Sequence, residues 1–265
     1  MGGADSMNMT RRRFHAPPAA FAPDKKSAAL SAEEARHLRD VLRLRQGDEI
    51  YVFDGEGREF HCQVQDIARD SVQLSVISEV AAARPESTLD LTLGIVLLKN
   101  EKFDLAIQKA TELGVRRIIP LESERADVRL RDSDDAHKRT TRWRRIAAEA
   151  AKQSGRARVP EVNDPLPFSS IVSAARDQQS PKGSARLMFA ERGGRSLQET
   201  ISGLSRTPLE IIAVVGPEGG WTDAEIELAR VGGWEIVTLG GRTLRAETAA
   251  IVVATLLQHR FGDLQ

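Results

Sequence analysis

The chain has 265 residues, of which 41% are hydrophobic and 29% charged, enough for one large or two modest hydrophobic cores. Its 38 basic and 38 acidic residues give a net charge of zero. The single cysteine, Cys62, excludes a disulfide framework and a multi-cysteine metal site, and this fits a reducing cytoplasm. No run of 18 or more apolar residues occurs, and the N-terminus lacks the apolar core of a signal peptide, so we expect neither a membrane nor a secreted protein.

The N-terminal part predicts a small β-rich domain that contains one helix. Residues 1–10 follow no pattern and are expected to form a disordered leader, so the domain is predicted over residues 11–80. Ser31 and Glu34 have the spacing of a capping box, and Leu38, Val41 and Leu42 continue an apolar helix face. Alternating residues between turn signals predict strands over 49–53, 59–67 and 71–77, and hence a compact barrel. Residues 81–87 then read as a linker.

From residue 88 to 265 the pattern changes to alternating strands and helices. A buried strand over 89–98, a helical stripe from Phe103 to Leu113 and a strand over 116–121 predict a βαβ unit, and with it a parallel sheet covered by helices. A charged loop is expected over 125–136. Further helices are predicted over 138–153, 165–175 and 196–203, and a further strand over 185–190.

Two glycine-bearing segments near the C-terminus are the strongest functional signal. Residues 216–220 follow a predicted strand over 211–215, and residues 239–249 follow one over 235–239. A capping box from Thr222 to Glu225 starts one helix, and residues 246–261 form a second, largely apolar one. Open α/β sheets bind ligands beyond the carboxyl ends of their strands, and glycines there let the backbone approach a ligand closely. A helix N-terminus favours a carboxylate, so a nucleoside carrying an amino-acid tail would suit this site. Alternatively, the glycines serve only turns, and Arg245 and Glu247 form a structural ion pair.

Several common chemistries lack their motifs. The chain has no dinucleotide fingerprint, no P-loop and no serine-hydrolase elbow. Its five histidines are scattered without metal-ligand spacing, so no metal is expected.

Local charge favours a nucleic-acid partner despite the neutral total. Residues 136–158 contain eight basic side chains and one acidic one, and further arginines cluster at 11–13 and at positions 36, 39, 43 and 45. Basic patches of this kind match a phosphate backbone. The alternative is that each run is a solvated helix face.

The two glycine segments carry a resemblance to a known family. Gly216-Pro217-Glu218-Gly219-Gly220-Trp221, followed by Leu239-Gly240-Gly241-Arg242-Thr243-Leu244-Arg245-Ala246-Glu247-Thr248-Ala249, resembles the small-subunit ribosomal RNA uridine-N3 methyltransferase family of the SPOUT class. Residues 99–102, 108–115 and 149–160 agree with it, and residues 37–48 with Arg13-Phe14 resemble its N-terminal PUA-like domain. The similarity runs from about Arg12 to Phe261, and Trp221 and Gly241 depart from the usual pattern.

The resemblance implies an α/β fold in which a PUA-like β-barrel precedes a SPOUT methyltransferase domain with a parallel sheet and a deep trefoil knot. Family members bind S-adenosylmethionine in the knotted loops and act as homodimers on 16S ribosomal RNA. The implied cofactor-binding residues are Ala190, Glu191, Gly216, Glu218, Gly219, Gly220, Leu239, Gly240, Leu244, Arg245, Glu247 and Thr248. The implied RNA-binding residues of the first domain are Arg12, Arg13, His37 and Arg43, and Arg142 and Arg145 of the basic segment are predicted to add phosphate contacts.

In the implied reaction, the target uridine exposes its Watson-Crick edge and loses its N3 proton. N3 then attacks the methyl group of the cofactor in line. Arg245 is the predicted stabiliser of the anionic uridine, and Glu218 the predicted proton acceptor. Two alternatives stay open: a SPOUT methyltransferase acting on another RNA nucleotide, and a non-enzymatic ribosome-assembly protein in which the glycine loops are structural.

Overall fold

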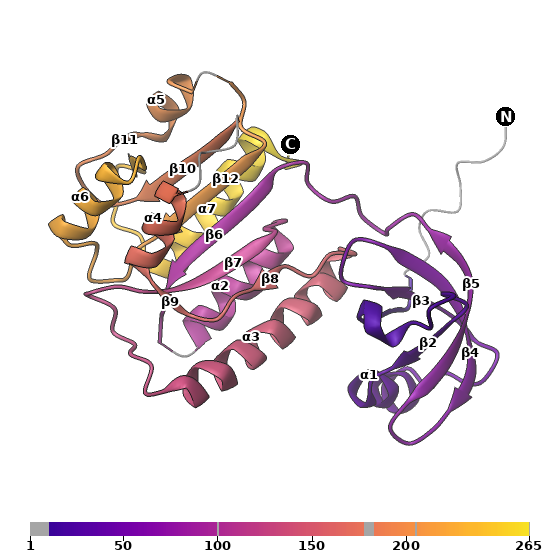
Figure 1. Cartoon of the computed structure of the whole chain (residues 1–265). Coiled ribbons are helices and arrows are strands. Elements are labelled where there is room, and N and C mark those ends of the chain that lie inside the picture. Colours follow the sequence, from indigo (N-terminus) through magenta and orange to yellow (C-terminus); the bar gives the residue numbers. More distant parts are fainter. Residues whose placement is uncertain (1–10, 100, 178–182, 205, 265) are drawn as a thin grey trace, which may run out of the picture. The chain divides into compact units, whose positions relative to one another are not determined.

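The computed structural model describes residues 11–99, 101–177, 183–204 and 206–264 (Figure 1), so the predicted leader lies outside the described residues. Contacts divide the chain into two units. The first extends to Glu86 and also contains Ala151–Val159, whereas the second contains Ser87–Ala150 and the chain from Pro160 onward. This division differs from the predicted domains, because residues 81–86 and 151–159 both join the first unit.

The first unit is built on a five-stranded sheet. Its strand order is β1 (Arg13–His15), β3 (Glu49–Phe53), β4 (Glu59–Ile67), β5 (Val72–Val80) and β2 (Ser27–Leu30). β1 pairs with β3 in parallel, and the other neighbours are antiparallel. The three predicted strands are confirmed as β3, β4 and β5. The short strands β1 and β2 were not predicted.

Helices of the first unit depart from the predicted pattern at one point. After η1 (Pro18–Ala20) and α1 (Ala32–Arg36), the chain continues as a π-helical turn, η2 (His37–Val41). The wider turn leaves Leu38 buried but exposes Val41 and Leu42, so the expected continuous apolar face is wrong. Ser31 caps α1 by accepting from the Glu34 N–H, 3.4 Å away.

Only half of the predicted capping box at Ser31 forms, because the Glu34 carboxylate has other partners. It accepts from the N–H of His15 at 3.3 Å and from Lys152 Nζ at 2.7 Å. The second contact attaches the C-terminal end of helix α3 (Ser133–Ser154) to the first unit. Arg156 adds to this attachment with an ion pair to Glu86 at 2.7 Å.

Arg13 is part of a buried ion cluster rather than an exposed basic run. Its guanidinium donates to both Glu59 carboxylate oxygens at 3.2 Å and to the carbonyls of Lys152 and Arg156. It also lies over the Phe53 ring, 4.6 Å from the centroid. The Arg13 side chain is 7% exposed and that of Glu59 is 0% exposed. The expectation that Arg13 contacts RNA is therefore corrected: its charge is already satisfied inside the fold.

The second unit contains an eight-stranded sheet in which every pairing is parallel, as the βαβ pattern predicted. Its strands lie in the order β11 (Arg195–Ser196), β13 (Glu235–Thr238), β10 (Ser184–Phe189), β12 (Glu210–Val215), β6 (Asp90–Val96), β7 (Arg117–Glu122) and β8 (Glu161–Val162), and β9 (Leu166–Pro167) also pairs with β7. The adjacent strands β13, β10 and β12 carry the loops of the candidate site.

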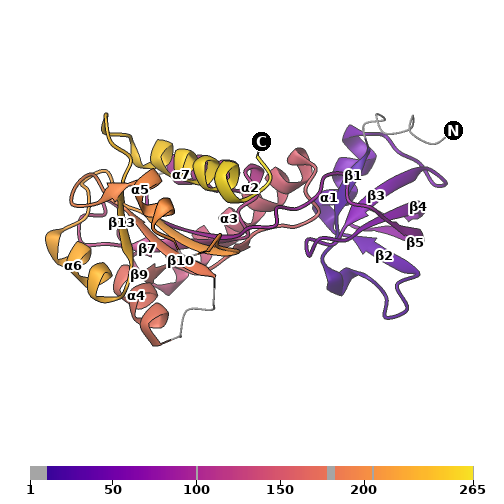
Figure 2. The ribbon, with the colours of Figure 1, turned by 90° about the horizontal axis from the view of Figure 1, so that it is seen from above.

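Helices cover both faces of this sheet (Figure 2). α2 (Glu101–Glu112) and α7 (Ala246–Phe261) pack together on one face, and α4 (Phe168–Asp177) and α6 (Asp223–Val231) pack together on the other. α5 (Leu197–Ser202) follows β11. Complete capping boxes start α5 at Ser196 and α6 at Thr222, the latter as predicted. α7 has its predicted bounds, and no helix in the described part of the chain is long and apolar enough to cross a membrane.

Candidate active site

Three neighbouring strands end at the same edge of the sheet and bring the candidate site together. Phe189, the last residue of β10, lies opposite Val215 of β12 on one side and Val237 of β13 on the other. The loops that follow these strands, residues 190–194, 216–222 and 239–245, therefore leave the sheet side by side. This is the carboxyl edge at which parallel sheets bind ligands.

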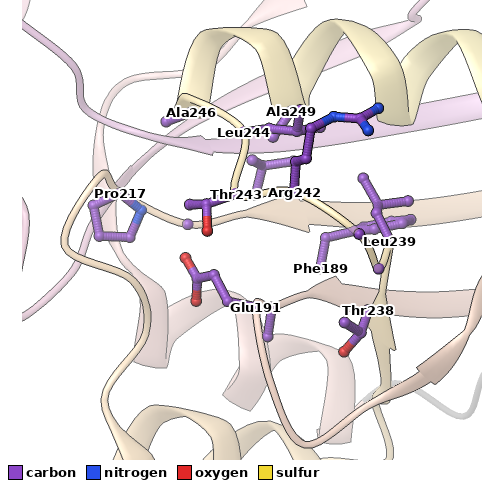
Figure 3. A pocket seen from close by; sticks show the side chains of 15 residues that line it. Phe189, Glu191, Pro217, Thr238, Leu239, Arg242, Thr243, Leu244, Ala246 and Ala249 are labelled. Carbon is purple, nitrogen blue, oxygen red and sulfur yellow. The ribbon is translucent and has the colours of Figure 1, made fainter.

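A cavity of about 180 Å³ lies between these loops and the start of α7 (Figure 3). It is lined by the last residues of the three strands, the loops that follow them and two residues of α7: Phe189, Ala190, Glu191, Val215, Gly216, Pro217, Thr238, Leu239, Gly240, Gly241, Arg242, Thr243, Leu244, Ala246 and Ala249. Eight of these fifteen residues are glycine, alanine or threonine, and such small side chains let a ligand approach the main chain closely.

The lining residues include one carboxylate and one cation. Figure 3 shows the Glu191 side chain directed toward Pro217 and Thr243, whereas the Arg242 guanidinium points away from Glu191. Glu191 is therefore the titratable group best placed to meet a ligand in this cavity.

Two positions of the 216–220 loop favour glycine, Gly216 because of close packing and Gly220 because of its backbone conformation. A Cβ atom on Gly216 would lie 2.7 Å from Nε1 of Trp221, a fully buried side chain. That Nε1 donates to the carbonyl of Phe189 at 2.9 Å, so the loop after β12 is bonded to the last residue of β10. Gly220 has φ +67°, and a Cβ there would lie 2.8 Å from a Glu191 carboxylate oxygen. Trp221, which departs from the family pattern, thus helps to hold the pocket wall.

Six of the predicted cofactor-binding residues line the cavity: Ala190, Glu191, Gly216, Leu239, Gly240 and Leu244. Six others do not line it: Glu218, Gly219, Gly220, Arg245, Glu247 and Thr248. Glu247 is buried in the first turn of α7, and its Oε2 has no hydrogen-bond partner within the described ranges.

The two predicted catalytic residues lie outside the cavity for different reasons. Glu218 is exposed and forms an ion pair with Lys102, so its carboxylate is directed to α2 rather than to the cavity. Arg245 is exposed and is the N-cap residue of α7, directly between the lining residues Leu244 and Ala246. Arg245 thus lies where the chain leaves the cavity, a position suited to a substrate that approaches from outside.

Sequence reasoning missed nine lining residues, although signals for them were present. Phe189, Val215 and Thr238 are the last residues of strands β10, β12 and β13. The other six are in the two glycine motifs that the resemblance rests on: Pro217, Gly241, Arg242, Thr243, Ala246 and Ala249. Extending the predicted site to every residue of the two motifs and to the last residue of each strand that leads into a predicted site loop would have found all nine.

Ion pairs connect the loops around this edge. Lys99, after β6, lies 2.8 Å from Asp127 in the loop after β7, and this hydrogen bond lowers the pKa of Asp127. In the same loop, Arg125 donates to the carbonyl of Gly219 at 3.3 Å. Because these groups are exposed, each contact adds little to stability.

The other predicted RNA-binding residues are distributed over both units. In the first unit Arg12 and Arg43 are exposed, and His37 is half-buried with its ring 6.0 Å from that of Phe14. In the second unit Arg142 and Arg145 are exposed on α3, where Arg142 forms an ion pair with Asp104. The excess positive charge counted over residues 136–158 is thus partly offset by acids from distant parts of the sequence.

Comparison with known proteins places these two units in one family. Residues 85–258 match the family model of an RNA methyltransferase domain, and residues 30–77 match that of an RNA methyltransferase PUA domain. The chain is 35% identical over 226 residues to the ribosomal RNA small subunit methyltransferase E of Synechocystis, covering 85% of this chain and 71% of the relative. The Bacillus subtilis protein of the same name is 31% identical over 88% of this chain and 90% of its own.

The chain belongs to the ribosomal RNA small subunit methyltransferase E family. Solved structures agree. A methyltransferase E from Neisseria gonorrhoeae, bound to S-adenosylmethionine, has a TM-score of 0.81 and 30% identity, with 96% of this chain and 100% of that chain covered. A putative methyltransferase from Legionella pneumophila, in complex with the same cofactor, has a TM-score of 0.83 and 29% identity, with 97% of this chain and 100% of that chain covered. The predicted family and its SPOUT fold class are confirmed, and the methyltransferase interpretation is favoured over an assembly protein.

Proposed function

We propose that this protein transfers a methyl group from S-adenosylmethionine to N3 of a uridine in 16S ribosomal RNA. The substrate in this proposal is the RNA within the small ribosomal subunit. The observation that carries the proposal is the cavity between the loops after β10, β12 and β13, together with membership of a small-subunit ribosomal RNA methyltransferase family. The uridine-N3 position rests on the motif resemblance.

The residues of the cavity fit the cofactor. Small side chains at Ala190, Gly216 and Ala249 leave room for a ligand, and a Cβ at Gly216 could not be added without moving Trp221. Backbone groups of residues 239–241 and 216–217 would hold the ligand's polar edges. When bound, S-adenosylmethionine supplies a methyl group on a positively charged sulfur that is already activated for transfer.

The protein's own task is to position the uridine and handle its N3 proton. Glu218 does not line the cavity, so we replace it as proton acceptor with Glu191, the one carboxylate among the lining residues. Arg245, exposed beside the cavity, stabilises the negative charge that develops on the uracil once the proton has left. The base must leave its stack for its Watson-Crick edge to reach this site.

Mass mapping of ribosomal RNA tests the function in cells. We expect RNA from a deletion strain to lack one methyl group on a single uridine of 16S ribosomal RNA, and the wild-type gene to restore it. Restoration should fail with Glu191→Gln, which keeps the size of the side chain and removes its basicity. A full methyl complement in the deletion strain would contradict the proposal.

We also propose that the protein is a homodimer that uses α7. One side of this helix is buried in the second unit, whereas Ile251, Val252 and Leu256 stay half-exposed. These three side chains form an apolar surface along the helix, which a second copy of the chain would cover. Sedimentation equilibrium at micromolar concentration is expected to give twice the 29.1 kDa chain mass. Only monomer at that concentration would contradict the dimer.

The trefoil knot and the cytoplasmic location remain predictions.

A further inference from the structure

The turn that ends the π-helical segment of the first unit projects two aliphatic side chains away from the core. The Leu42 N–H bonds to the carbonyl of His37, and the Leu44 N–H bonds to that of Leu38, both at 3.1 Å. Leu38 and Leu44 are buried, so both ends of the turn are anchored. Between them, Val41 is 65% exposed and Leu42 is 38% exposed.

Arg43, the next residue, has φ +54°, which is a left-handed backbone conformation. This conformation is higher in free energy for a residue with a Cβ atom than for glycine. Helices commonly end in this conformation, usually with glycine. The chain follows that rule after α2, where Gly114 has φ +80°, and after α3, where Gly155 has φ +83°. Arginine in this position places an exposed charged side chain at the end of the turn, beside Val41 and Leu42.

Basic residues flank the exposed pair in the sequence. The helix and the turn contribute Arg36, Arg39, Arg43 and Arg45, and the one acid among residues 36–45, Asp40, forms an ion pair with Arg39 at 2.7 Å. An apolar tip flanked by arginines complements nucleic acid, because the cations meet phosphates while the aliphatic groups contact the faces of unstacked bases.

We propose that residues 41–43 form a wedge that inserts Val41 and Leu42 against exposed bases where an RNA helix opens into a loop, while Arg43 contacts a phosphate beside them. The inference rests on the proposed function in taking RNA as substrate, and it assigns the RNA feature that the first unit reads. An open helix end is favoured over a regular duplex because side chains contact base faces only where stacking is interrupted.

Two variants of the full chain separate this role from a structural one. Arg43→Gly relieves the left-handed strain and should raise the unfolding midpoint by about 2 °C. The same change should weaken binding to a fluorescent RNA hairpin and reduce the slope of log K against log salt by about 0.7 to 0.9. Val41→Ser with Leu42→Ser should weaken hairpin binding about tenfold and leave the salt slope unchanged. Ile77→Ser, which changes an exposed aliphatic residue of β5, is the matched control and should bind as the wild type.

Hairpin binding that is unchanged in the double serine variant would overturn the wedge. So would a double variant that loses binding to anionic phosphatidylglycerol vesicles and not to RNA, because the tip would then serve a membrane surface. These titrations need no methyl transfer. A wild type that binds the hairpin through the wedge but produces another methylated nucleoside would overturn the proposed reaction and leave this inference standing.

Discussion

Replacing Gly216 with valine is expected to abolish binding of S-adenosylmethionine. The new Cβ would lie 2.7 Å from Trp221 Nε1, and this buried indole cannot move without breaking its hydrogen bond to Phe189, which also lines the cavity. Overpacking of this kind costs about 1 to 3 kcal/mol of stability. Displacing this wall into the cavity should weaken the binding free energy by about 3 kcal/mol or more. Calorimetry should therefore show a loss of affinity of at least about a hundredfold.

The matched control for this variant is Gly219→Val in the same loop. Gly219 does not line the cavity, and a Cβ there would meet Arg125 at 3.3 Å rather than any lining residue. We therefore expect its affinity to stay close to that of the wild type, although the sequence alone places Gly219 at the cofactor. Circular dichroism establishes that each variant folds, and Gly216→Ala tests the same contact with less added volume. Loss of binding in Gly219→Val with none in Gly216→Val would place the cofactor elsewhere.

Replacing Glu59 with alanine is expected to be the most destabilising single change in the first unit. Its fully buried carboxylate accepts from Arg11 and Arg13 at 3.2 Å and from the Ala83 N–H at 2.8 Å. Without it the buried Arg13 guanidinium would lose its counter-charge. Removing one partner of a buried pair costs about 3 to 5 kcal/mol, which urea unfolding at neutral pH measures directly.

Arg11→Ala provides the control for the Glu59 variant. The Arg11 side chain is 31% exposed, so the loss of its contact to Glu59 should cost about 1 kcal/mol or less. Equal losses in the two variants would mean that Arg13 is stabilised mainly by the carbonyls of Lys152 and Arg156.

Local patterns predicted most of the longer elements but not the short strands β1, β2, β8, β9 and β11, and the motifs predicted where the site lies. α7 begins at Ala246 and ends at Phe261 as its apolar run indicated, and β3 and β4 have their predicted bounds. The cavity lies at the predicted strand ends because the carboxyl ends of parallel strands share one edge.

Long-range partners account for what the sequence did not predict. Arg13 reads as part of an exposed basic run because its partner Glu59 is 46 residues away, and Glu218 reads as a free carboxylate because Lys102 is 116 residues away. The attachment of residues 151–159 to the first unit depends in the same way on Glu34 and Glu86. Local spacing does not report such pairs. It also did not indicate the π-helical turn that exposes Val41 and Leu42.

The most direct test of the proposed reaction uses the purified protein, S-adenosylmethionine with an isotopically labelled methyl group, and small ribosomal subunits from a deletion strain. Nucleosides from the digested RNA are separated and identified by mass spectrometry. We expect the label in 3-methyluridine, at no more than one per subunit, and its loss when Arg245→Ala is used although the cofactor still binds. Label on a ribose or on another base would contradict the uridine-N3 assignment, and full turnover by Arg245→Ala would contradict the role given to that residue.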